Sequence, residues 1–138
     1  MSPLTIQNIK DGDEILAIVL RNEFDKEGLN FITNEDCSFQ VAVHNVKRGT
    51  RYKAHITNPF SNINLLKANK IYYVAEGKVG IDLYGLNEKK IKYITLNKGD
   101  LILFINGGHG LDILEKSKVI EIKQGPYRGQ DKDKKFLE

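Results

Sequence analysis

Short runs of alternating apolar and polar residues, separated by turn residues, fill most of the chain. The run at residues 14–21 is rich in β-branched side chains and too short for a typical helix, so it predicts a buried strand. Similar runs predict further strands at residues 31–33, 39–46, 51–57, 70–74, 78–84, 91–96, 101–105, 111–114 and 118–124. No segment shows the sustained apolar spacing of an amphipathic helix.

About ten short strands at this spacing are typical of an all-β sandwich or barrel. The turn Ala75-Glu76-Gly77 lies between two of the runs and predicts a hairpin. A flat sheet of so many strands would leave long edges exposed, so we expect an antiparallel structure that is closed or doubled into two sheets. With 138 residues, the chain is expected to form a single domain that is long enough to bury a core.

The charges favour a small molecule over a nucleic acid as partner. The net charge of +3 comes partly from Lys89-Lys90 and from residues 132–135, where basic and acidic residues are mixed and no arginine stripe forms. No apolar run approaches the length that spans a bilayer, and the first residues do not resemble a signal peptide. We therefore expect no nucleic-acid partner, no membrane partner and a cytoplasmic location. Cys37 is the sole cysteine, which excludes an internal disulfide and a cysteine-rich zinc site.

Two histidines stand out because each comes at the end of a strand-like run and close to glycines. His55 lies in the run that begins after Gly49, and His109 lies in Gly107-Gly108-His109-Gly110, after the run at 101–105. An imidazole titrates near neutrality, so both are candidates for acid–base catalysis. The alternative is a hydrogen-bonded structural histidine, and for His44 we prefer that interpretation.

The spacing around these histidines resembles the cupin signature. In the first cupin motif, a glycine is followed by five residues and then by His-x-His; a glutamate comes further on, and a second glycine lies seven positions after that glutamate. Gly49, His55 and Thr57 match its first half with one substitution, and Lys70 and Gly77 match its second half with lysine in place of glutamate. The segment from Gly99 to His109 resembles the second motif.

The resemblance covers about residues 31–136 and implies a cupin-type antiparallel β-barrel or double-stranded jelly roll with little helix. The whole chain, 1–138, would be one cupin-like domain, with a core at about 31–124 and a C-terminal tail at 125–138. The tail sequence from Glu121 to Tyr127 resembles small cupin-like proteins linked with surface-polysaccharide and nucleotide-sugar pathways. Cupins often pair through N-terminal strands, so the resemblance also implies a homodimer.

In metal-binding cupins, the positions that match His55, Thr57, Lys70 and His109 hold a divalent ion. A threonine hydroxyl is a poor ligand for transition metals, and a lysine ammonium places positive charge where the cation belongs. We therefore predict no cofactor, with His55 and His109 as the candidate ligands if a metal does bind. Two imidazoles and an ammonium favour a small anionic ligand instead.

The resemblance leaves three functions open. In the first, the protein is an isomerase or epimerase acting on a sugar nucleotide or related anionic carbohydrate, with His55 and His109 as the acid–base pair. Lys70 would then stabilise an enolate or bind a phosphate. In the second, the protein binds such a ligand through a degenerate site without chemistry. In the third, it is a metal-dependent cupin with an unusual ligand set.

The last strand and the tail add three candidate ligand-binding residues. Lys123, Tyr127 and Arg128 could hold a phosphate or carboxylate near the mouth of the fold, since arginine offers a planar fork of donors. The alternative is that the Gly-Pro-Tyr segment packs the end of the last strand. We prefer packing for Tyr127 and leave Arg128 open.

Overall fold

The computed structural model describes residues 5–60, 67–125, 129 and 134–138. Within these ranges the protein has ten strands and no helix, which confirms the all-β class that the sequence predicts. It follows that no helix in the described part has the length and apolar character needed to cross a membrane. The chain divides into two compact units: unit 1 comprises Met1–Phe24 and Ala68–Glu138, and unit 2 comprises Asp25–Lys67. The single-domain organisation expected from the length stays a prediction.

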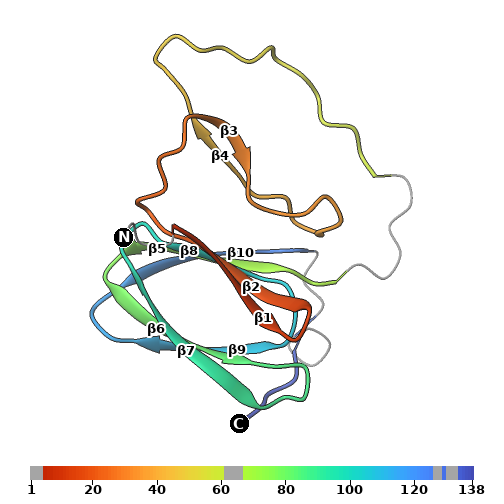
Figure 1. Cartoon of the computed structure of the whole chain (residues 1–138), viewed down its shortest axis with the longest axis vertical. Helices are drawn as coiled ribbons and strands as arrows, with labels where there is room; N and C mark the ends of the chain where they lie inside the picture. The colour runs from red at the N-terminus through yellow and green to blue at the C-terminus, as the bar shows by residue number, and fades with distance from the viewer. Residues whose placement is uncertain (1–4, 61–66, 126–128, 130–133) are drawn as a thin grey trace. The chain divides into compact units, whose positions relative to one another are not determined.

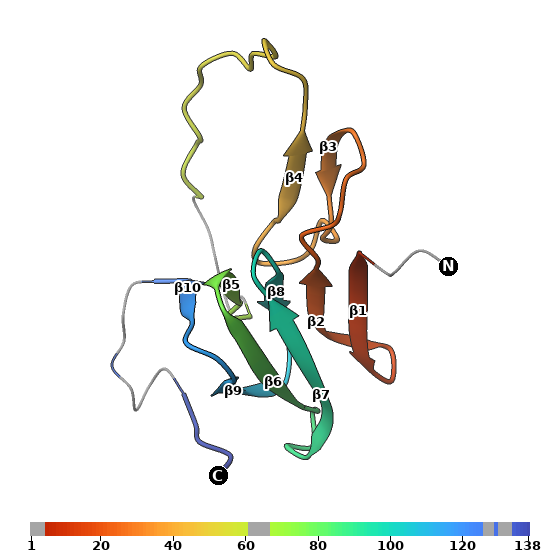
Figure 2. The same cartoon turned by 90° about the vertical axis from the view of Figure 1, so that its left-hand side faces the viewer.

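Unit 1 contains two antiparallel sheets (Figures 1 and 2). The five-stranded sheet has the order β1 (Ile6–Asp11), β2 (Glu14–Leu20), β8 (Leu101–Phe104), β5 (Lys70–Glu76) and β10 (Lys118–Lys123). The three-stranded sheet has the order β7 (Lys90–Asn97), β6 (Lys78–Tyr84) and β9 (Gly108–Ile113). β5 and β6 lie on either side of the turn at Gly77 but do not pair with each other, because each belongs to a different sheet. The hairpin predicted there is therefore wrong, and the turn connects the two sheets.

The core of unit 1 lies between its two sheets. Alternate residues of each strand point to the same face, so one face of each sheet is apolar. The five-stranded sheet contributes Ile9, Ala17, Val19, Tyr72, Val74, Ile102 and Phe104, and the three-stranded sheet contributes Val79, Ile81, Leu83, Ile94 and Leu96. Of the two architectures expected, a closed barrel is not seen among the described residues; the strands form separate sheets instead.

A buried carboxylate connects the two sheets of unit 1 at the turn between β7 and β8. Asp100 is almost fully buried, and it accepts hydrogen bonds from the backbone N–H groups of Asn22 (3.0 Å) and Asn97 (2.8 Å). The guanidinium of Arg21 donates to Asp100 (3.0 Å) and to the carbonyl of Thr95 on β7 (2.9 Å). The ion pair and the hydrogen bonds offset part of the cost of burying this charge.

Unit 2 has a two-stranded sheet, in which β3 (Gly28–Phe31) pairs antiparallel with β4 (Ala42–Asn45). The strand predicted at residues 51–57 is wrong: this segment is extended but has no strand partner, and every residue in it is exposed. Its alternating pattern is a local property, whereas a strand also needs a neighbour to satisfy its backbone groups. Ile56, which the pattern would bury, is 89% exposed.

Candidate functional site

Four strands of unit 1 bring aromatic and charged side chains together between the two sheets. Lys70 and Tyr72 are two residues apart on β5, so both point to the inner face of the five-stranded sheet. The register places Phe104 of β8 opposite Lys70, and Glu121 of β10 opposite Tyr72. From the other sheet, β9 contributes His109, which lies opposite the core residue Leu83.

Three rings form a compact group, which we call the ring cluster: Tyr72, Phe104 and His109. The imidazole of His109 stacks on Phe104, with centroids 3.9 Å apart and an angle of 12° between the planes. Tyr72 meets both rings edge-on, at 5.6 Å from His109 and 5.3 Å from Phe104. Tyr72 and Phe104 are buried, while His109 is partly exposed, so His109 is the ring of the cluster that solvent reaches most easily.

Two opposite charges lie beside the ring cluster. The ammonium of Lys70 is 5.8 Å from the centroid of the Tyr72 ring, within the range of a cation–π contact. It is also 3.6 Å from a carboxylate oxygen of Glu121. The side chain of Lys70 is 20% exposed and that of Glu121 is 43% exposed, so the carboxylate is the more solvated partner.

The environment of His109 keeps its imidazole neutral. Burial lowers the pKa of His109 to about 4, helped by the positive charges of Lys70 and Lys134 and opposed by Glu121. At pH 7, only about one molecule in a thousand would then carry the proton. A neutral imidazole has one N–H donor and one acceptor nitrogen, so His109 can donate one hydrogen bond and accept another.

Tyr72 is also held in its neutral form. Burial raises its pKa, as do the negative charge of Glu121 and the hydrogen bond between the phenol and that carboxylate. The phenol therefore acts as a hydrogen-bond donor to Glu121 at neutral pH.

A glycine turn sets the position of His109. Gly107 has φ +72°, and a Cβ atom at this position would lie 2.2 Å from the backbone oxygen of Tyr84. The chain can therefore enter β9 close to the end of β6 only if residue 107 has no side chain. This close approach explains one of the glycines of the Gly-Gly-His-Gly segment without a ligand.

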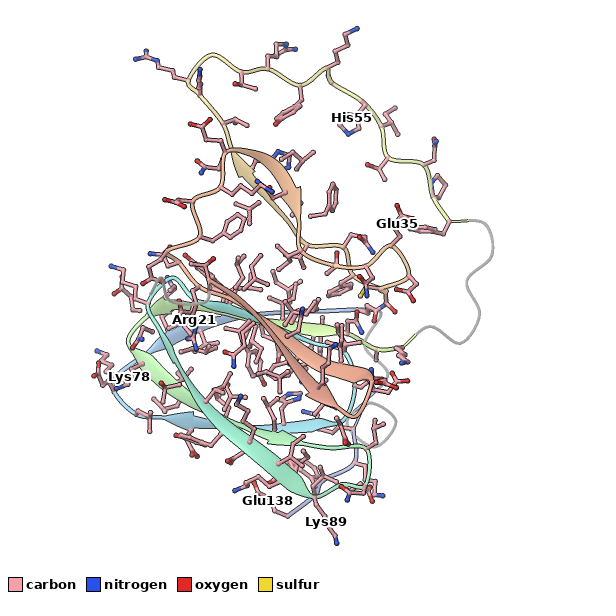
Figure 3. The ribbon with its side chains drawn as sticks, in the orientation of Figure 1. Arg21, Glu35, His55, Lys78, Lys89 and Glu138 are labelled. Atoms are coloured by element: carbon pink, nitrogen blue, oxygen red, sulfur yellow. The ribbon has the colours of Figure 1, made fainter. Side chains whose placement is uncertain are left out.

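The other predicted site residues of the motif lie in unit 2. His55 is exposed in the extended segment labelled in Figure 3, where its Nδ1–H donates to the carbonyl of Lys53 at 2.9 Å. Thr57, two residues further on, is also exposed. His44 hydrogen-bonds through Nδ1 to the hydroxyl of Tyr52 at 3.2 Å.

Of the three candidate ligand-binding residues in the last strand and the tail, the structure describes one. Lys123 ends β10 and lies opposite Lys70 in the register, so the two lysines lie at the same end of the five-stranded sheet. Tyr127 and Arg128 lie outside the described residues.

The donor set beside the ring cluster does not fit a divalent cation. Glu121 and His109 are the available ligands there, and the ammonium of Lys70 lies next to both of them. Over the described ranges, no group of three or more His, Cys, Asp and Glu side chains could hold a metal ion.

Sequence reasoning identified Lys70 and His109 but missed Tyr72, Phe104 and Glu121 as site residues. Tyr72 had a local signal, since it shares a strand face with Lys70. Phe104 and Glu121 had none, because their places depend on the pairing of β8 and β10 with β5.

Comparisons with protein-family models, curated proteins and solved structures found no match to this chain. The chemistry of the site therefore rests on its own residues.

Proposed function

We propose that the protein binds an anionic carbohydrate beside the ring cluster, with Lys70 as the anion-binding group. The observation that carries this proposal is a neutral imidazole, His109, next to a lysine ammonium and two buried aromatic rings. Ligand sites commonly combine apolar and aromatic walls with a few polar groups that fix orientation. Lys70 would attract the anionic group, and His109 would exchange hydrogen bonds with hydroxyl groups.

The same observation favours binding over proton transfer by His109. General acid–base catalysis works best when the pKa of the catalytic group is near the working pH. The pKa of about 4 makes His109 a weak base at pH 7 and leaves almost none of the imidazolium form that could act as an acid. The acid–base pair of His55 and His109 stays a prediction, and so does the cupin-type jelly roll. The carbohydrate part of the proposal rests on the cupin resemblance.

Calorimetric titration at pH 7 and low salt tests the proposal. We expect binding of glucose 1-phosphate and of glucuronate, and little or no binding of neutral glucose. Lys70→Met keeps the length of the side chain and removes its charge. The affinity for both anions should therefore fall by roughly 10- to 100-fold, the range for a charge-assisted hydrogen bond.

A second lysine provides the matched control. Lys98 is exposed and pairs with Glu76 at 3.3 Å, at the opposite end of β5 from Lys70. Lys98→Met removes the same charge and should leave both affinities within about twofold, because an exposed, distant charge is screened. Equal losses in the two variants, or a wild-type protein that binds neither anion, would contradict the proposal. Mass spectrometry of the same mixtures shows whether any product forms.

A further inference from the structure

The carboxylate of Glu121 lies where the anionic group of a ligand would meet Lys70. The register of β5 and β10 sets Glu121 directly opposite Tyr72, and its Oε1 is 3.6 Å from the Lys70 ammonium. It also accepts the hydrogen bond of the Tyr72 phenol. Glu121 thus lies against both polar side chains that β5 presents at this site.

The ion pair of Lys70 and Glu121 is loose. Its separation of 3.6 Å exceeds the usual length of an N–H···O hydrogen bond, so the attraction is mainly through space. The Glu121 side chain is 43% exposed, and ion pairs this close to solvent are weak. The carboxylate is therefore the more easily displaced of the two charges, since Lys70, at 20% exposed, is held more firmly between the sheets. Turning Glu121 into water breaks this weak ion pair and its hydrogen bond with the Tyr72 phenol.

We propose that Glu121 is a specificity-determining residue: its carboxylate occupies the anion position beside Lys70 in the free protein, and a bound ligand must displace it. This inference rests on the proposed function, because it assigns a competitor to the same site. A built-in negative charge opposes every anionic ligand and has little effect on a neutral one. The opposition grows with the charge of the ligand, because repulsion is proportional to it.

The test uses Glu121→Gln, which keeps the shape of the side chain and an oxygen that can accept from Tyr72. Three probes of increasing charge are titrated by calorimetry at pH 7 and low salt: glucose, glucuronate and glucose 1-phosphate. We expect no change for glucose, about threefold tighter binding of glucuronate, and about tenfold tighter binding of glucose 1-phosphate. Both gains should shrink at high salt.

The control is Glu76→Gln, which removes the same charge from the far end of β5, where Glu76 pairs with the exposed Lys98. This variant should bind all three probes as the wild type does. A gain that is equal for all three probes would show a structural effect and overturn the inference.

Two further outcomes separate this inference from the proposed function. If Glu121→Gln binds the anions more weakly or unchanged while Lys70→Met loses them, the binding site stands and the role of Glu121 as competitor is wrong. Weaker binding would mean that Glu121 itself contacts the ligand. If neither the wild type nor Glu121→Gln binds an anion, both proposals fail.

Discussion

At the scale of single residues, the burial of His109 against Phe104 and Tyr72 makes the stability of the protein depend on pH. Its pKa falls from the ordinary 6.5 to about 4. Burial is the main cause, Lys70 and Lys134 add to the decrease, and Glu121 opposes it. Between these two values the unfolded chain binds a proton at this residue that the folded protein does not. The free energy of unfolding therefore decreases as the pH falls from about 6.5 to about 4. Above this window the residue is neutral in both states and adds no pH dependence.

We expect His109 to contribute a loss of up to about 3 kcal/mol across this window. Urea unfolding at pH 7, 6, 5 and 4 measures it in the wild type and in His109→Gln, whose side chain does not titrate. The two proteins share all other ionisable groups, so the difference between their free energies of unfolding isolates His109. As the pH falls, the free energy of unfolding of the wild type should decrease relative to that of His109→Gln. A difference that is constant with pH would show that the imidazole titrates normally.

At the scale of elements, the entry into β9 depends on the glycine at 107 and not on the glycine at 110. Gly107 has a left-handed backbone conformation, and a side chain there would meet the backbone of Tyr84, which cannot move without disturbing β6. At Gly110, by contrast, the nearest atom to an added Cβ would be Asp82 Oδ2 at 3.5 Å, an ordinary contact. The two glycines of one motif therefore have different structural requirements.

This difference predicts opposite results for two alanine substitutions. Gly107→Ala should lower the free energy of unfolding by at least about 2 kcal/mol, because it adds backbone strain and a backbone clash. Gly110→Ala should change it by no more than about 0.5 kcal/mol, since the side chain has room and alanine restricts the unfolded chain. Urea unfolding at pH 7 measures both. Similar stabilities for the two variants would show that β9 can shift to accommodate residue 107.

The elements also show what the sequence can predict. The turn at Gly77 and most strands of unit 1 were predictable because their signals are local: a glycine and an alternating run. That β5 and β6 would join different sheets and not pair as a hairpin was not predictable, since it depends on contacts with strands far away in the sequence. The position of Glu121 beside Lys70 was not predictable either, because it follows from the pairing of β10 with β5, and a shift of one residue would turn Glu121 to the other face. At residues 51–57 the sequence predicts a strand that does not form, because this segment has no neighbouring strand to pair with.

At the scale of the whole molecule, the two predicted histidines belong to different units. His109 lies on β9 of unit 1, and His55 lies in the extended segment of unit 2. Motif spacing identifies residues of a family pattern, but it carries no information on how strongly each segment is packed. All residues from 46 to 60 are exposed and outside regular structure, whereas every residue of the buried hydrophobic core described above belongs to unit 1.

Limited proteolysis tests this contrast between the units. Trypsin needs an extended, accessible backbone, which residues 46–60 present without unfolding, whereas the strands of unit 1 must first open against their hydrogen bonds and core packing. We therefore expect the first cuts after Lys47, Arg48, Arg51 and Lys53, at least about tenfold faster than any cut after Lys70 or Lys78, because strand opening is rare. Mass spectrometry of timed samples identifies the sites. A variant with glutamine at these four early positions should lose the fast fragments and keep the slow ones, whereas early cuts within β5 or β6 would show that unit 1 is the less stable part.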